Sequence, residues 1–116
     1  MINTNLIDIE TFRDNFSELF DCKEDYFIIV RAITEKNYNI FLDVINPKGL
    51  KRGWKNNHVD HRFSISQGFK EKIDPFIIAH PSNLQMLKAK DNKKKNAKCD
   101  HTLEELYEKV NNFGIV

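Results

Sequence analysis

The two cysteines constrain the fold most, because their spacing predicts neither a disulfide framework nor a zinc site that could stabilise a small domain. Cys22 and Cys99 lie far apart, and neither belongs to a Cys-x-x-Cys pair. This spacing argues against a disulfide framework and excludes a zinc ribbon or knuckle. The 116 residues, of which 41% are hydrophobic, must therefore bury one core of their own. Any metal must be held by oxygen and imidazole nitrogen.

No segment of the sequence is typical of a membrane protein. The longest apolar run, Phe27 to Val30, has four residues, whereas a membrane-spanning helix needs roughly 20. The N-terminal residues Met1–Asn5 lack the basic-then-apolar order of a signal peptide. We therefore expect a cytoplasmic protein with no membrane partner.

Charge is distributed unevenly along the chain. Residues 46–98 carry thirteen basic and four acidic side chains, while residues 1–45 have a net charge of −5 and residues 99–116 one of −3. The basic centre could attract a polyanion, because each Lys or Arg that meets a phosphate releases condensed counterions. It could equally be a lysine-rich face that only favours solubility. Charge alone leaves both interpretations open.

Hydrophobic spacing predicts helices in the N-terminal part, residues 1–45. Asp8 is a plausible N-cap for an amphipathic helix over residues 9–20. Its apolar face would carry Ile9, Phe12, Phe16, Leu19 and Phe20. We predict mostly helix over residues 26–45, although the apolar run at its start also fits a buried strand.

The rest of the chain predicts two short strands and two further helices. Strands fit residues 58–63 and 83–88, and a basic helix fits residues 90–98. Between the strands, residues 64–82 predict an irregular segment in which Asp74 caps one or two helical turns.

A C-terminal helix is predicted over residues 102–113. Thr102 and Glu105 form a capping box. The inward face of this helix would carry Leu103, Leu106, Tyr107 and Val110. We therefore predict a single, mostly helical α+β domain over residues 1–116.

The most informative stretch contains four polar landmarks in a fixed order. Asp60 and His61 end the first strand, Asn83 opens the second, and Asn92 lies in the basic helix nine residues later. An Asp-His pair alone occurs often by chance, and a lone histidine is more often structural than catalytic. The order strand, strand, helix with these landmarks is much more specific.

This order resembles the HNH endonucleases, and most closely the small phage-type enzymes related to homing endonucleases. The resemblance extends over roughly residues 26–110 and implies a ββα-metal motif over residues 56–98. It rests on the runs His58–Phe69, Ile73–Pro75, Asn83–Leu87 and Asn92–Lys95.

The sequence departs from the family pattern at two places. Asn92 stands where many members have histidine, a variant that the family tolerates. Lys88–Asp91 stands where many members have a Cys-x-x-Cys staple. We therefore expect no structural zinc, so the fold must rest on packing.

The resemblance implies a role for each landmark in phosphodiester hydrolysis. His61 would be the general base, and Asp60 with Asn92 would hold one Mg²⁺ or Mn²⁺ ion through hard oxygen donors. Asn83, placed with His61 in the catalytic set, would bond the intervening loop and hold His61; a simple turn-forming role is the alternative. Because adjacent strand residues face opposite ways, Asp60 and His61 can share a site only where the strand ends or distorts.

Basic side chains around these landmarks are expected to contact DNA phosphates. Lys95 matches the lysine that the family usually has three positions after the last landmark. Trp54 could stack on a base or pack into the core, and we expect packing because an indole buries a large apolar area. The proposed DNA-binding residues are Lys51, Arg52, Lys55, Arg62, Lys93, Lys94, Lys95 and Lys98.

We therefore expect a metal-dependent DNA endonuclease that makes nicks or double-strand breaks. The chain has no evident sequence-reading module, so a homodimer or a partner protein would supply specificity. Two alternatives stay open. One is a non-cleaving nucleic-acid-binding protein that retains the scaffold, and the other is a phage-like structural or inhibitory protein whose lysines face solvent.

Overall fold

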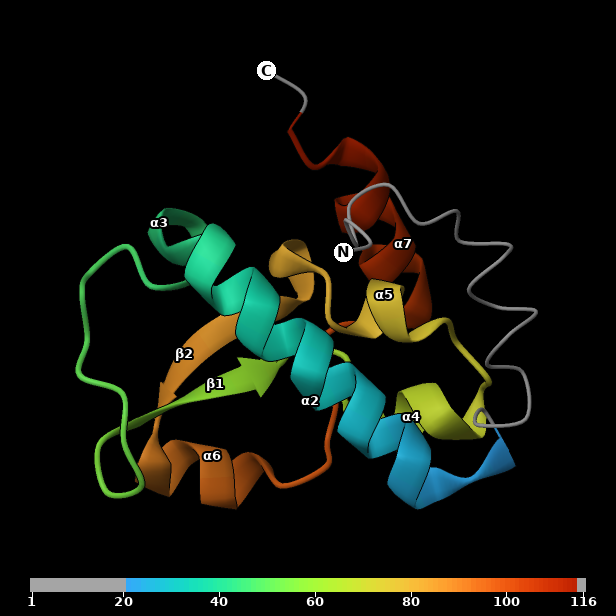
Figure 1. The fold of residues 1–116 in the computed structure, drawn as a ribbon, viewed down its shortest axis with the longest axis horizontal. Helices are drawn as coiled ribbons and strands as arrows, with labels where there is room; N and C mark the ends of the chain where they lie inside the picture. The colour runs from blue at the N-terminus through green and yellow to red at the C-terminus, as the bar shows by residue number, and fades with distance from the viewer. Residues whose placement is uncertain (1–20, 115–116) are drawn as a thin grey trace, which may run out of the picture.

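The computed structural model describes residues 21–114, which form a small α+β domain (Figure 1). The helix predicted over residues 9–20 lies outside the described residues. In chain order the elements are α2 (Lys23–Ile40), α3 (Leu42–Ile45), β1 (Asn57–His61), α4 (Ile65–Lys70), α5 (Pro75–Ile78), the 3-10 turn η3 (Pro81–Asn83), β2 (Leu84–Lys88), α6 (Ala89–Lys95) and α7 (Leu103–Asn112).

Helix α2 forms because buried side chains recur along it at every fourth position. Tyr26, Val30, Thr34 and Tyr38 are all buried, and this spacing places them on one face. Ile28, on another face, is exposed. The mostly helical prediction for this region is confirmed, and the alternative of a buried strand is wrong.

Strands β1 and β2 form a two-stranded antiparallel sheet in which His61 pairs with Leu84. The strand predicted over residues 58–63 ends at His61, although the Arg62 amide still donates to the Asn83 carbonyl at 2.8 Å. Helix α6 follows β2 directly and packs against both strands. The predicted order strand, strand, helix is therefore present.

The segment between the strands is more helical than its sequence suggests. Helix α4 was not predicted; Ser64 caps it by accepting from the Gln67 amide at 3.1 Å. Gly68 interrupts the hydrophobic pattern that would have predicted this helix. A Cβ at this position would lie 2.7 Å from Ile78 and 2.9 Å from the Tyr26 hydroxyl. The glycine thus allows α4 to approach the core closely.

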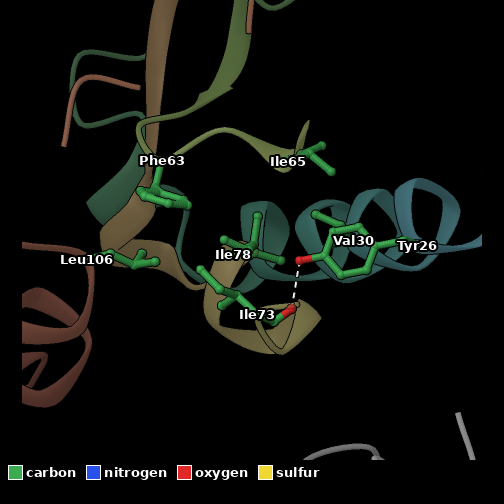
Figure 2. Packing of buried hydrophobic residues seen from close by; sticks show 8 residues of the cluster. Tyr26, Val30, Phe63, Ile65, Ile73, Ile78 and Leu106 are labelled. Carbon is green, nitrogen blue, oxygen red and sulfur yellow. Dashed lines mark hydrogen bonds between the residues drawn. The ribbon is translucent and has the colours of Figure 1, made fainter. Parts of the chain in front are cut away.

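The main hydrophobic core joins α2, α4, α5 and α7 (Figure 2). Tyr26 brings a polar group into this cluster, and its hydroxyl donates to the Ile73 carbonyl at 2.7 Å. Burial raises the pKa of this hydroxyl far above its usual value, so it stays a donor. The buried members of the cluster are Tyr26, Val30, Phe63, Ile65, Ile73, Ile78, Ala79 and Leu106.

The two predicted caps in the second half of the chain are confirmed. The Asp74 carboxylate accepts from the Phe76 amide at the start of α5. The capping box of Thr102 and Glu105 begins α7, whose Leu106 is buried in the core. The inward orientation expected for Tyr107 is wrong, because its ring is exposed.

Within residues 21–114, no helix combines the length and the apolar character needed to cross a bilayer.

Candidate functional site

A cavity of about 580 Å³ lies at the end of β1, between α2 and α6. In Figure 1 β1 points toward α2, and α6 lies beside β1. Asp60, His61 and Asn92 all border this cavity, and Lys95 lies beside them. The fold therefore brings three of the four landmarks to one place.

Asp60 and His61 reach the cavity from opposite faces of β1. Asp60 contacts Lys95 of α6, whereas His61 contacts Thr34 of α2. This is the alternation expected along a strand. Because His61 is the last strand residue, both side chains can border a cavity that opens at the strand end.

The hydrogen bonds of His61 define which nitrogen can act as a base. Its Nε2 lies 2.8 Å from the Thr34 hydroxyl, and that hydroxyl donates its single proton to the Val30 carbonyl at 2.7 Å. Thr34 must therefore accept from His61, so Nε2 carries the proton and Nδ1 keeps its lone pair.

Electrostatics keep His61 neutral. Burial lowers its pKa to about 3, and the positive charges of Lys95 and Arg31 act in the same direction. The imidazole is therefore unprotonated at any physiological pH. A neutral ring with one free lone pair can accept a proton.

Asp60 is a buried carboxylate whose negative charge is balanced by the ammonium of Lys95. Its side chain and that of Lys95 are only 6% and 8% exposed, and they form an ion pair at 3.1 Å. Gln85 donates to its second oxygen at 2.9 Å. Lys95 also donates to the His61 carbonyl at 2.9 Å. Lys95 is therefore part of the site and is not a free surface lysine.

Asn92 is oriented by a second histidine. Its Nδ2 donates to Nδ1 of His58 at 2.9 Å, while Nε2 of His58 donates to the Trp54 carbonyl at 2.9 Å. The carbonyl acceptor fixes the tautomer of His58. With its amide nitrogen engaged, Asn92 has its Oδ1 as the donor atom for a cation.

Asn83 lies in the core and does not border the cavity. It is 1% exposed, and its Oδ1 accepts from the Phe63 amide at 2.8 Å. Its Nδ2 donates to the carbonyls of Phe63 and Ile78 at 3.0 and 2.8 Å. Asn83 thus holds the backbone just after His61, and it does not face a substrate.

The donor atoms of Asp60 and Asn92 suit a divalent cation. A carboxylate and an amide oxygen are hard donors, and Mg²⁺ commonly binds one or two such groups together with waters and substrate phosphate. Among the described residues, no three His, Cys, Asp or Glu side chains gather as a metal cluster. The donor set fits an exchangeable ion, for which Lys95 would have to release Asp60.

The basic residues expected at DNA divide into engaged and free groups. Arg52 forms a bidentate pair with Glu35 and lies 4.7 Å over the Tyr38 ring. The hydrogen bonds from Arg52 lower the pKa of Glu35. Lys95 is held by Asp60. Lys93 is exposed and lies 5.6 Å from the centroid of the Trp54 ring. Within residues 21–114, the free group is Lys51, Lys55, Lys94 and Lys98, which are exposed, and Arg62, which is half-buried.

Sequence reasoning missed the contribution of α2 to the site. Lys23, Arg31 and Thr34 border the cavity, and Thr34 sets the tautomer of His61. Only tertiary packing brings α2 to β1, so no local pattern marks these residues as functional.

Comparison of the chain with protein-family models, with curated proteins and with solved structures finds no match. A functional assignment must therefore rest on the geometry of the cavity.

Proposed function

We propose that this protein is a metal-dependent DNA endonuclease of the HNH type, with β1, β2 and α6 as its ββα motif. One observation carries the proposal: a neutral histidine whose Nδ1 keeps its lone pair borders the same cavity as a carboxylate and an amide. These are the groups that phosphodiester hydrolysis needs for a base and for an oxygen-ligated ion. Asn83 is then a positioning residue.

The proposed reaction moves one proton to His61. Nδ1 takes a proton from water while Nε2–H stays bonded to Thr34. The resulting hydroxide attacks phosphorus, the bond to the 3′ oxygen breaks, and solvent protonates the leaving oxygen. A phosphate in the cavity would oppose the charges of Lys95 and Arg31, which lower the His61 pKa, and would make the ring a stronger base.

Mg²⁺ or Mn²⁺ held by Asp60 and Asn92 would supply Lewis-acid stabilisation of the phosphate charge and of the leaving oxygen. Once free of Asp60, Lys95 can pair with a phosphate. Lys23 and Arg31 on the α2 side can pair with a second one. The protein thus offers positive charge on two sides of the cavity.

The proposed substrate is DNA in the cytoplasm of the host cell. The exposed lysines of α6, Lys93 and Lys94, extend the positive charge beyond the cavity. A homodimer or a partner protein would add sequence specificity.

The decisive experiment incubates supercoiled plasmid with the protein and Mg²⁺ or Mn²⁺. We expect nicked or linear product, and a loss of rate of about 10²–10⁴-fold for His61→Ala, typical of a positioned acid or base. Asp60→Ala should also lose cleavage. His101→Ala is the matched control, because this imidazole lies outside the cavity and its Nδ1 has no hydrogen-bond partner among the described residues. Equal rates for all four proteins would refute the catalytic assignment.

The Asp60–Lys95 ion pair favours a second candidate, a nucleic-acid-binding protein that does not cut. If the pair never opens, the carboxylate is unavailable to an ion. Such a protein would retard plasmid DNA without cleaving it, with or without divalent ions. His61→Ala would then leave its behaviour unchanged.

A further inference from the structure

Trp54 is the only tryptophan of the chain, and its side chain is directed into solvent. It is 76% exposed, so the packing expected from its sequence is wrong. An indole normally contributes a large apolar area to a core or to an interface. Here that area stays in water within the described structure.

Hydrogen bonds to backbone carbonyls hold the turn that carries Trp54. Its carbonyl accepts from Nε2 of His58 at 2.9 Å. On either side, the Asn56 amide donates to the Gly53 carbonyl at 3.0 Å, and the Asn57 side chain donates to the Lys51 carbonyl at 2.8 Å. The indole is therefore carried by an anchored turn.

Basic residues lie near the indole in space or in sequence. The ammonium of Lys93 lies 5.6 Å from the ring centroid, and Lys51 and Lys55 are exposed on the same turn. An aromatic face among cations is the combination that binds single-stranded nucleic acid, because bases stack on the ring while lysines pair with the backbone.

His58 links this surface to the cavity. It bonds the Trp54 carbonyl through one nitrogen and the Asn92 amide through the other, and Asn92 borders the cavity. His58 therefore lies between the Trp54 backbone and the proposed metal ligand, and its ring centroid is 6.4 Å from that of the indole. A nucleotide stacked on Trp54 would lie close to a phosphate in the cavity.

We propose that Trp54 and Lys93 form a stacking platform for an unpaired nucleobase beside the phosphate that is cut. This inference rests on the proposed endonuclease function and specifies its substrate: DNA that carries a single-stranded or unpaired nucleotide next to the cleavage position. In an intact duplex both faces of each base are covered by its neighbours, so the platform finds no partner there.

Trp54 reports on its own occupancy, because excitation selective for indole detects this residue alone. The full chain is titrated in EDTA, without cleavage, with oligothymidylate, with a fully paired duplex, and with that duplex carrying an unpaired overhang. We expect quenching with oligothymidylate and with the overhang duplex, and little quenching with the fully paired duplex. Equal quenching by the paired duplex, absence of quenching despite binding, or absence of any binding would each overturn the platform.

A matched pair of variants tests the same point by affinity. We expect Trp54→Leu to weaken binding of the overhang duplex about 5- to 100-fold, the range for loss of one stacked base, and to leave the paired duplex unaffected. Tyr107→Leu, at an exposed ring on α7, should change neither. Equal affinities of Trp54→Leu and the unmodified protein would contradict the proposal.

The two hypotheses fail separately. Quenching without His61-dependent cleavage of either the plasmid or the overhang duplex would leave a binding platform on a protein that does not cut. Cleavage without quenching would leave the endonuclease and remove only the platform. A thermal melt of Trp54→Leu verifies that it is folded.

Discussion

The apolar core and the Asp60–Lys95 pair at the cavity are buried to a similar degree but are stabilised by different forces. In the core, Tyr26 and Ile78 are fully buried, and the Tyr26 hydroxyl is satisfied by a backbone carbonyl. At the cavity, Asp60 and Lys95 are almost as inaccessible, yet they are charged and depend on each other. Burying apolar area stabilises the core directly, whereas a buried ion pair roughly offsets its own desolvation. The buried charges at the cavity therefore contribute little to stability, unlike the apolar side chains of the core.

Two asparagines nine residues apart show the same contrast within one residue type. Asn83 gives its amide to three backbone groups in the core. Asn92 is half-buried and gives its amide nitrogen to His58. The first is committed to structure, and the second retains an oxygen for a ligand.

The largest expected effect on stability concerns the core. Ile78→Ala should lower the free energy of unfolding by about 2–5 kcal/mol, since it leaves a cavity among fully buried neighbours. Ile28→Ala, at an exposed isoleucine of α2, should change it by less than about 0.5 kcal/mol. Urea unfolding measures both values. Similar losses of stability for Ile78→Ala and Ile28→Ala would show that the two isoleucines do not differ in burial as the structure indicates.

A smaller effect is expected where the two asparagines are compared. Asn83→Ala leaves one amide and two carbonyls without their partner, and we expect a loss of about 1–3 kcal/mol. Asn92→Ala should cost less than about 1 kcal/mol, because its position is half-buried. Thermal unfolding gives both values. A larger loss for Asn92→Ala than for Asn83→Ala would show that Asn92, and not Asn83, is the asparagine that stabilises the fold.

The expected effect of pH on stability is a slope that originates at the cavity. The His61 pKa is lowered from 6.5 to about 3 in the folded protein, so between these values only the unfolded chain binds this proton. Unfolding free energy should therefore fall as the pH falls from about 6.5 to 3, by up to about 1.4 kcal/mol per pH unit from this group.

Chemical denaturation at a series of pH values measures that slope. His61→Gln should remove this contribution and leave the contributions of other groups, among them His80, whose pKa burial also lowers. A slope identical to that of the unmodified protein would mean that His61 is accessible to protons in the folded state.

Local patterns were sufficient for most of the helices and strands. The capping box at Thr102 and the cap at Asp74 mark helix starts because they depend only on neighbouring residues. Helix α4 escaped prediction because six residues that include Gly68 carry too little periodicity. Its cap, Ser64, was a signal that could have found it.

The sequence by itself determined the order of strand, strand and helix and the residue types placed along it. Those features depend on side-chain alternation and spacing, which act between near neighbours. Tertiary structure alone decided that Thr34 orients His61, that Lys95 neutralises Asp60 and that Trp54 stays in water. These contacts join helices and strands far apart in the chain, and their existence depends on how the whole core packs.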